Sequence, residues 1–400
     1  MVSAVISEFN PFHKGHEYLT NQAKKITGCD TMLTIISGNY VQRGEPAIFD
    51  KYTRAKIALL SGYDICLEIP VYAVLSSAQF YAYNTVRILD RLGIVDNLCF
   101  GCENDDISVL TEIADILCDE PHEFKELLKD YISNGKSYAA AVGMALEKYS
   151  SNKSFADIIS LPNNILAIEY IKALKSLNSK IKPVAVKRKG APHNSTVIDS
   201  ANICSASLIR DLINKDDKSY INYINDSCKK TIEAINQPHV NAVFVKKIAD
   251  IFNYLRTIKD ENYFAEINEC NIFLANKIMN LSNSLSSYED IIAALKSKDN
   301  TYTRLSRLIL CSVLEITQND LELFSTQKPY VKLLGLRKSK SFVLKDCNKE
   351  NIDIITKWST YVNDNPDNKL VKKELSINDL YLGLADSTTR EISKSVIVIE

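Results

Sequence analysis

Short apolar runs alternate with amphipathic stretches from residue 1 to about residue 105, and this alternation constrains the fold more than any other feature. Strands separated by helices need crossover connections, so the pattern predicts a parallel sheet with helices on both faces. Ligands bind such sheets beyond the carboxyl ends of the strands. The expected strands are Val2–Ser7, Thr31–Ser37, Asp64–Pro70 and Val95–Phe100, and the expected helices are His16–Lys25, Lys51–Ser61 and Ser77–Leu92.

A fifth strand, Ile181–Arg188, and a helix, Ser205–Ile213, complete this pattern after a helical stretch. We therefore expect a Rossmann-like, doubly wound α/β domain over residues 1–215, with a helical insertion at about 106–178. Residues 216–400 are expected to form a mainly helical domain, in which 330–336 and 341–344 are short strands or extended loops. The expected helices are Ile107–Cys118, His122–Asn134, Tyr138–Tyr149, Asn164–Leu177, Lys218–Asn225, Val240–Leu255, Ile272–Leu281, Tyr288–Ser297, Thr303–Ile316 and Ser376–Leu384.

Composition excludes several classes of protein. The 400 residues carry a net charge of −1, so any binding of nucleic acid must use a local basic patch. No apolar run is long enough to span a bilayer, and no signal peptide is visible, which predicts a cytoplasmic protein without membrane contact. The ten cysteines lie mostly in apolar runs. Cys99 and Cys102 form the single C-x-x-C, without a second ligand pair, so neither zinc nor redox chemistry is expected.

Two of the five histidines, His13 and His16, lie where the first strand turns into the first helix. Residues three apart share one face of a helix, so both imidazoles are expected to point the same way. Gly15 between them leaves no side chain that would block a ligand against the backbone. A helix N-terminus attracts phosphate, and histidines there can stabilise a departing phosphate. This H-x-G-H sequence therefore predicts a nucleotide phosphate site.

Two further segments are expected to face the same crevice. The loop at residues 38–50 follows the second strand and contains Arg43, which can bind an anion through its planar guanidinium group. Lys51 begins the next helix, where a cation is unfavourable, so an anionic partner is expected nearby. Ser205 and Ser207 begin the helix after the fifth strand and can cap it or hold phosphate, with Arg210 one turn further.

Two sites remain open between a structural and a ligand-binding role. Asn163 and Asn164 begin a helix, where one asparagine would serve as the cap and either could recognise a base or a ribose. Arg188 ends the fifth strand, where it could contact an adenylate phosphate or stack on adenine.

The segments EFNPFHKGH (8–16), SGNYVQRGEPAIFDK (37–51), FGCEND (100–105), LPNNILAIEY (161–170), VKRKGAPHNS (186–195) and SASLIR (205–210) together resemble the tRNA(Met) cytidine acetate ligase family. That family belongs to the HIGH-type nucleotidyltransferase superfamily. One departure is Cys102, where the family pattern leads us to expect a small polar residue. The similarity is strongest from residue 1 to about 210 and weaker beyond it.

The resemblance implies a ligase that joins acetate to ATP as acetyl-adenylate, releasing pyrophosphate. The acetyl group would then pass to the exocyclic amine (N4) of the wobble cytidine of elongator tRNA(Met). It implies catalytic roles for His13, Lys14, His16 and Arg210, with Mg²⁺ on the phosphates. ATP would be bound by Ser7, Glu8, Phe9, Asn10, Pro11, Phe12, His13, Gly15, His16, Leu19, Gly101, Asn163, Asn164, Arg188, Ser205 and Ser207.

Two alternatives stay open: an adenylyltransferase that makes a dinucleotide cofactor from a small phosphorylated acceptor, and a non-catalytic ATP-responsive RNA-binding protein. The oligomeric state is left open as well. Contacts with tRNA are expected from Tyr302 or Tyr330, which could stack on a base, and from two basic stretches. These comprise Lys172, Lys175, Lys180, Lys182, Lys187, Arg188 and Lys189, and Arg304, Arg307, Lys328, Lys332, Arg337, Lys338 and Lys340.

Overall fold

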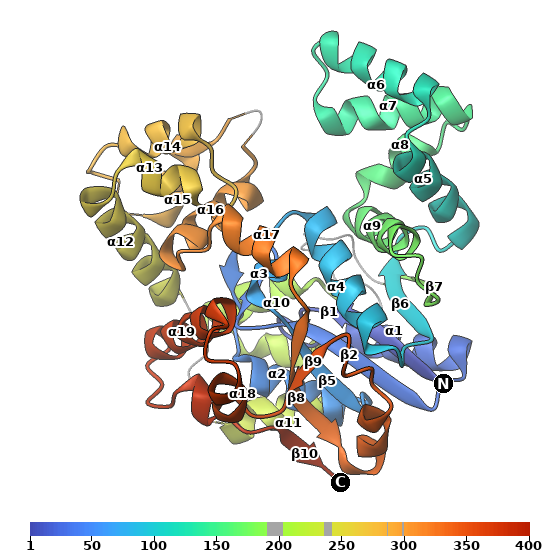
Figure 1. Ribbon diagram of the computed structural model, residues 1–400, viewed down its shortest axis with the longest axis vertical. Coiled ribbons are helices and arrows are strands. Elements are labelled where there is room, and N and C mark those ends of the chain that lie inside the picture. The colour runs from blue at the N-terminus through green and yellow to red at the C-terminus, as the bar shows by residue number, and fades with distance from the viewer. Residues whose placement is uncertain (190–202, 236–241, 286, 298–299) are drawn as a thin grey trace.

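The structure is a computed structural model that describes residues 1–189, 203–235, 242–285, 287–297 and 300–400 (Figure 1). Its centre is an eight-stranded sheet in the order β10-β8-β5-β2-β1-β6-β7, with β9 paired to β8. The five predicted strands are all present, and they lie parallel to one another. These strands are β1 (Val2–Ser7), β2 (Thr31–Ser37), β5 (Ile65–Ile69), β6 (Asn97–Cys102) and β7 (Lys182–Lys187).

Alternate residues of β1 face opposite sides of the sheet, and both sides are buried. Ala4 and Ile6 belong to one hydrophobic cluster, whereas Val5 belongs to the other. The first cluster includes α3 (Val71–Val74), α4 (Ala78–Leu92) and α9 (Pro162–Ser176), and the second includes α1 (Lys14–Thr27), α2 (Lys51–Leu60) and α10 (Ala206–Asn214). Burial on both faces explains why these strands are continuous apolar runs, and it confirms the predicted doubly wound architecture.

A helical insertion precedes β7, as predicted, and projects beyond β6 and β7 (Figure 1). It contains α5 (Ile107–Asp119), α6 (His122–Ser133), α7 (Tyr138–Ser150), α8 (Phe155–Ser160) and α9. The short helix α8 was not predicted. Of these helices, α9 packs on α4 and so attaches the insertion to the sheet.

The sequence predicts that the α/β domain ends near residue 215, but the sheet contains strands from beyond that point. Strand β8 (Tyr330–Arg337) pairs antiparallel with β5, and β9 (Asp353–Ile355) and β10 (Ile397–Ile399) pair with β8. The last seventy or so residues therefore return to the α/β core, because the apolar run of β8 is buried beside β5. Residues 341–344, for which the sequence predicts a short strand or an extended loop, lie in a 3₁₀ helix, η2 (Lys338–Lys345).

The rest of the second half is helical, as predicted. Its helices α12 to α16 gather away from the sheet, on the other side of the molecule from the insertion (Figure 1). The predicted helix start at Val240 lies outside the described residues. The elements are η1 (Lys218–Asn222), α11 (Asp226–Ile235), α12 (Ala242–Ile258), α13 (Glu261–Glu266), α14 (Ile272–Met279), α15 (Tyr288–Leu295), α16 (Tyr302–Val313), α17 (Gln318–Thr326), α18 (Trp358–Asp364), α19 (Lys369–Leu384) and η3 (Glu391–Ser393).

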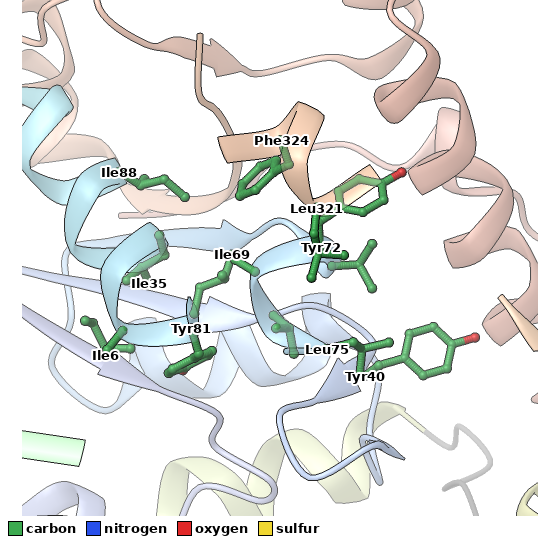
Figure 2. Close-up of a cluster of buried hydrophobic side chains, with 14 of the residues drawn as sticks. Ile6, Ile35, Tyr40, Ile69, Tyr72, Leu75, Tyr81, Ile88, Leu321 and Phe324 are labelled. Atoms are coloured by element: carbon green, nitrogen blue, oxygen red, sulfur yellow. The ribbon is translucent and has the colours of Figure 1, made fainter. Parts of the chain in front are cut away.

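Helix α17 connects this second half to the sheet. Figure 2 shows Leu321 and Phe324 from α17 beside Tyr72 and Leu75, in a cluster that continues to Ile69 of the sheet. The rings of Phe324 and Tyr72 have centroids 5.8 Å apart. The helical part is thus fixed to the α/β core through a shared hydrophobic layer. Among the described helices, none is long and apolar enough to cross a membrane.

Candidate active site

A cavity of about 310 Å³ lies beyond the carboxyl ends of β1, β2, β6 and β7. This is the position that the parallel sheet predicts. Most of the predicted site residues line it together. They are Ser7, Glu8, Phe9, Asn10, His13, His16, Leu19, Gly101, Asn163, Arg188, Ser205, Ser207 and Arg210.

The two histidines form the N-terminal cap of α1. His13 is the N-cap residue, and its Nδ1 accepts a hydrogen bond from the backbone N–H of Gly15 at 3.0 Å. The Nδ1 of His16 accepts one from the backbone N–H of His13 at 3.3 Å. Because Nδ1 is the acceptor in both rings, each neutral ring carries its proton on Nε2. Both histidines line the cavity, and a neutral ring with its proton on Nε2 is a donor suited to phosphoryl oxygens.

Aromatic packing holds His16 in place. Its ring centroid lies 5.0 Å from that of Phe9 and 5.5 Å from that of Phe12. Burial, followed by the nearby His13 and Arg188, lowers the pKa of His16 well below its usual 6.5. The imidazole of His16 is therefore neutral at pH 7 until an anion binds beside it.

Gly15 leaves space for the side chain of His13. A Cβ at this position would lie 2.8 Å from Cε1 of His13 and 3.0 Å from its Nδ1. The missing side chain thus leaves room for the capping imidazole, and Gly15 itself does not line the cavity. The requirement for glycine comes from the histidine cap.

Five predicted residues do not line the cavity. Phe12 is fully buried and packs on Phe9 and His16. Lys14 bonds through its backbone N–H to the carbonyl of Tyr223, at 3.2 Å, and is not among the residues that line the cavity. The remaining residues are Pro11, Gly15 and Asn164.

The two asparagines have separate roles. Asn164 is fully buried, and its Oδ1 accepts the N–H groups of Glu103 and Asn104 at 2.9 and 3.0 Å. Asn163 lines the cavity instead, where its Oδ1 accepts a hydrogen bond from Arg188 at 3.2 Å. Asn164 is therefore a structural residue, and Asn163 is placed to contact a ligand together with Arg188.

The serine-rich turn holds the second helix N-terminus of the site. Ser205 caps α10 by accepting the N–H of Leu208 at 3.2 Å, and its hydroxyl lies 2.9 Å from that of Ser207. Arg210, one turn later, donates to the carbonyl of Asn10 at 2.8 Å. This bond joins α10 to the turn that precedes the histidine cap, so both helix starts face one cavity.

One carboxylate, Glu8, lines the cavity among the described residues, and arginines surround it. Burial raises its pKa, whereas the backbone N–H of Gln42 and the charges of Arg210, Arg43 and Arg54 oppose that shift. Arg54 is fully buried and donates to the carbonyls of Glu8 and Ser37 at 2.6 and 3.0 Å. It thereby ties β1 to the end of β2, a role for which the sequence contains no signal.

The loop at residues 38–50 forms one wall, as predicted. Within it, β3 (Tyr40–Val41) and β4 (Glu45–Pro46) form a small hairpin that was not predicted. The expected anionic partners of Lys51 are present, but they belong to the protein. Lys51 Nζ lies 2.7 Å from Glu68 and 2.8 Å from Glu391, so this buried group anchors the loop and is unavailable to a ligand.

Two tyrosines that the sequence analysis missed contribute to the site. Tyr81 of α4 and Tyr170 of α9 line the cavity, and their side chains are hydrogen-bonded to each other. Both residues fall at apolar positions of amphipathic helices, so they look like ordinary core residues in the sequence. Cys102, the departure from the family pattern, is buried in β6 and does not line the cavity.

The predicted basic stretches are largely paired within the protein. Arg304 and Arg307 both contact Glu269, at 3.5 and 2.6 Å, and Lys332 is buried. Lys328 and Arg337 pair with Asp353 and Asp64. In the first stretch Lys172, Lys175 and Lys187 have acidic partners, while Lys180, Lys182 and Arg188 are exposed. Residues 190–195 of the VKRKGAPHNS segment lie outside the described residues.

A Rossmann-like sheet whose first helix is capped by two histidines is typical of nucleotidyltransferases. The family described as HIGH Nucleotidyl Transferase matches residues 1–395 of the chain. The tRNA(Met) cytidine acetate ligase of Thermoanaerobacter sp. (strain X514) is 34% identical over 382 residues, which cover 95% of this chain and 94% of that protein. The protein of the same name from Clostridium novyi (strain NT) is 37% identical over 369 residues, covering 91% of each chain.

Solved structures agree with this assignment. Thermotoga maritima TmcAL bound with alpha-thio ATP matches with a TM-score of 0.88 at 27% identity, over 99% of both chains. Its apo form I matches with a TM-score of 0.91 at 27% identity, over 100% of this chain and 99% of that chain. The chain belongs to the tRNA(Met) cytidine acetate ligase family.

Proposed function

We propose that the protein activates acetate with ATP and transfers the acetyl group to N4 of the wobble cytidine of elongator tRNA(Met). The observation that carries this proposal is the paired histidine cap, which lines a cavity together with Arg188 and Arg210. The names of the relatives and the ATP analogue bound to the Thermotoga maritima protein support the same activity.

In this proposal the phosphates of ATP lie between the N-termini of α1 and α10. Both termini offer backbone N–H groups and a partial positive charge, and Arg210 joins them. Asn163 and Arg188 contact the nucleoside end from the opposite wall. The remaining contacts come from the cavity residues Ser7, Glu8, Phe9, Asn10, Leu19, Gly101, Ser205 and Ser207.

The first step needs little help from a base, because acetate is already an anion. One of its oxygens attacks the α-phosphorus, the bond to the β-phosphate oxygen breaks, and pyrophosphate leaves with the bonding electrons. Negative charge builds on the departing pyrophosphate. The Nε2–H groups of His13 and His16 can stabilise this charge by donating hydrogen bonds. Positioning and charge neutralisation are thus the chief catalytic effects, as in other phosphoryl-transfer sites.

Mg²⁺ fits this site as a companion of the nucleotide. Magnesium is usually held by one or two carboxylates and by substrate phosphates. Glu8 is the one carboxylate that lines the cavity among the described residues, and no group of three or more acidic, histidine or cysteine side chains there forms a metal site. Bound Mg²⁺ would neutralise phosphate charge, with Glu8 as its protein ligand.

Label transfer tests the proposed activity. Enzyme, ATP, ¹⁴C-acetate and bulk tRNA should give label in elongator tRNA(Met), as N4-acetylcytidine at the wobble position. Acetate-independent release of pyrophosphate with a small phosphorylated acceptor would instead identify a dinucleotide-forming adenylyltransferase. Binding of RNA and ATP with no turnover of either would indicate a non-catalytic protein.

A further inference from the structure

The hairpin wall of the cavity rests on the helical half of the chain. Gln42 and Arg43, at the tip of the β3–β4 hairpin, line the cavity from one side. The next residue, Gly44, has a φ of +81°, and a Cβ on it would collide with the backbone of Ser306 and Arg307 in α16. The backbones of the hairpin and of α16 are therefore in direct contact, so the position of α16 sets the position of this wall.

Gln42 is the residue through which this contact reaches the cavity. Its N–H donates to Glu8 at 2.8 Å, and its side-chain amide donates to the carbonyl of Ser76 at 3.0 Å. Its own carbonyl accepts a hydrogen bond from Arg307 at 3.4 Å. The peptide groups on both sides of Gln42 are thus fixed, and with them the start of Arg43.

Arg43 lies near Arg210, the arginine that joins the two helix starts of the site. Burial lowers the pKa of Arg210, and the charges of Glu45 and Glu8 oppose that shift. The positive charge of Arg43 lowers the pKa further, so the two guanidinium groups lie close enough to act on each other. Two neighbouring arginines that face one cavity can bind a chain of phosphates together.

Glu269 holds the arginine that fixes Gln42. Its Oε1 accepts a hydrogen bond from Nε of Arg307 at 2.6 Å, and its Oε2 lies 3.5 Å from Nε of Arg304. Arg304 also donates to the backbone carbonyl of Glu269 at 3.2 Å. The side chain of Glu269 is 13% exposed, so water competes little for these bonds. Removal of its carboxylate would allow the guanidinium group of Arg307 to turn away from the hairpin.

The backbone of Glu269 adopts a conformation that favours glycine. Its φ is +71°, at the third position of a turn that the N–H of Cys270 closes on the carbonyl of Ile267 at 3.1 Å. Eight non-glycine residues in the described part of the chain have a positive φ, and six of them lie one or two positions beyond a helix, where this conformation ends the helix. The other two are Phe9, which lines the cavity, and Glu269. Because no helix end explains the strain at Glu269, the strain indicates a role for the side chain that glycine could not fill.

We propose that Glu269 is a positioning residue for ATP: it holds Arg307 against Gln42 and thereby fixes Arg43 in the cavity. The inference rests on the proposed function, in which the ATP phosphates lie beside Arg210. A residue of the helical half then controls the affinity of the cavity for ATP without touching the nucleotide.

The test measures the Kd for ATP by calorimetry in Glu269→Gly, Arg43→Ala and the double variant. Loss of a charged hydrogen bond to phosphate should raise the Kd of Arg43→Ala roughly 10- to 100-fold. Glu269→Gly suits the turn and removes the carboxylate, and it should raise the Kd at least about fivefold. The double variant should bind ATP no more weakly than Arg43→Ala, because Glu269 acts through Arg43. A calorimetric stoichiometry equal to that of the wild type shows that loss of folded protein does not cause these changes.

Two control variants separate the carboxylate from the turn. Glu315 also has a positive φ, of +54°, and its side chain is exposed just beyond α16. Glu315→Gly makes the same chemical change and should leave the Kd for ATP unchanged. Glu269→Gln keeps the length of the side chain and one oxygen that can accept from Arg307, so its Kd should stay within about threefold of the wild type.

A wild-type Kd in Glu269→Gly or in Arg43→Ala would overturn the positioning role. Effects of the two substitutions that multiply in the double variant would also overturn it, because Glu269 would then act independently of Arg43. The proposed function fails separately, if the wild type binds ATP and gives no acetate-dependent exchange of pyrophosphate. In that case the ATP affinities still decide the role of Glu269.

Discussion

The imidazole rings of His13 and His16 stack with their centroids 3.8 Å apart and their planes 25° from parallel. Each ring accepts a backbone N–H of the helix start through Nδ1. A capping box normally uses a hydroxyl and a carboxylate, whereas here two imidazoles fill both roles. The helix terminus that we propose to bind phosphate and the imidazoles that cap it are therefore a single unit.

Substitution of Gly15 by alanine should disrupt that unit. The new Cβ would lie 2.8 Å from Cε1 of His13, so the ring must rotate away and lose its capping bond. We expect pyrophosphate exchange to fall by about 10²-fold, with the free energy of unfolding lowered by about 0.5–2 kcal/mol for the lost cap. Exchange kinetics and urea unfolding measure the two effects.

Gly383→Ala provides the matched control. No atom lies within 4 Å of a Cβ built at this position in α19, so the substitution should raise stability by about 0.5–1 kcal/mol and leave exchange unchanged. Full activity in Gly15→Ala would show that His13 does not depend on the small residue beside it.

The two asparagines should respond differently to truncation. Asn164→Ala would leave two backbone N–H groups and the carbonyl of Ile158 without their partner, and should destabilise the protein by at least about 2 kcal/mol. Asn163→Ala should raise the KM for ATP several-fold with little change in stability. The reverse pattern, a stable Asn164→Ala enzyme with a raised KM, would contradict the assigned roles.

Acidification should weaken the protein through His16. Its folded pKa lies well below 6.5 because burial and the nearby His13 and Arg188 disfavour the cation, whereas in the unfolded chain it titrates near 6.5. The unfolded state therefore binds the extra proton, and stability falls as the pH drops from 6.5 towards the folded pKa. Between about pH 7.5 and pH 5.5, the wild type should lose more stability than His16→Asn. Urea unfolding at the two pH values measures the difference, and equal losses would contradict it.

The buried charge group behind the loop at 38–50 should be sensitive to removal of its cation. Lys51→Met would remove the cation that is paired with both buried Glu68 and Glu391, at a cost of about 3–5 kcal/mol. Lys215→Met, which removes an exposed partner of Asp211, should change stability by no more than about 0.5 kcal/mol. A Lys51→Met protein as stable as this control would show that the carboxylates are protonated or hydrated without their partner.

The sequence predicts the parallel strands well because burial on both faces makes each one a continuous apolar run. The return of residues 330–399 to the sheet is harder to predict from the sequence. Lys332 lies in the middle of β8, where it resembles a surface lysine in the sequence, yet burial and the charge of Lys51 lower its pKa to about 8. Pairing between β5 and β8 joins segments more than 260 residues apart, and no local pattern specifies such a contact.

The same limit applies to the site. The spacing of His13 and His16 indicates a shared helix face, so both were found. Asn163 and Asn164 are chemically identical neighbours, and only the direction of each side chain distinguishes a ligand contact from a structural hydrogen bond. In the sequence, Arg304 and Arg307 resemble an RNA-binding pair. In the structure, both form ion pairs with Glu269, which lies in another segment of the chain.

Acetate-dependent exchange of ³²P-pyrophosphate into ATP is the most direct test of the central claim, that the histidine-capped cavity activates acetate. The wild-type enzyme should exchange label when acetate is present and not when it is omitted. His16→Asn should reduce the rate by about 10²- to 10³-fold, as expected for loss of a donor to developing charge. Exchange that proceeds equally without acetate, or a His16→Asn enzyme with the wild-type rate, would contradict the account.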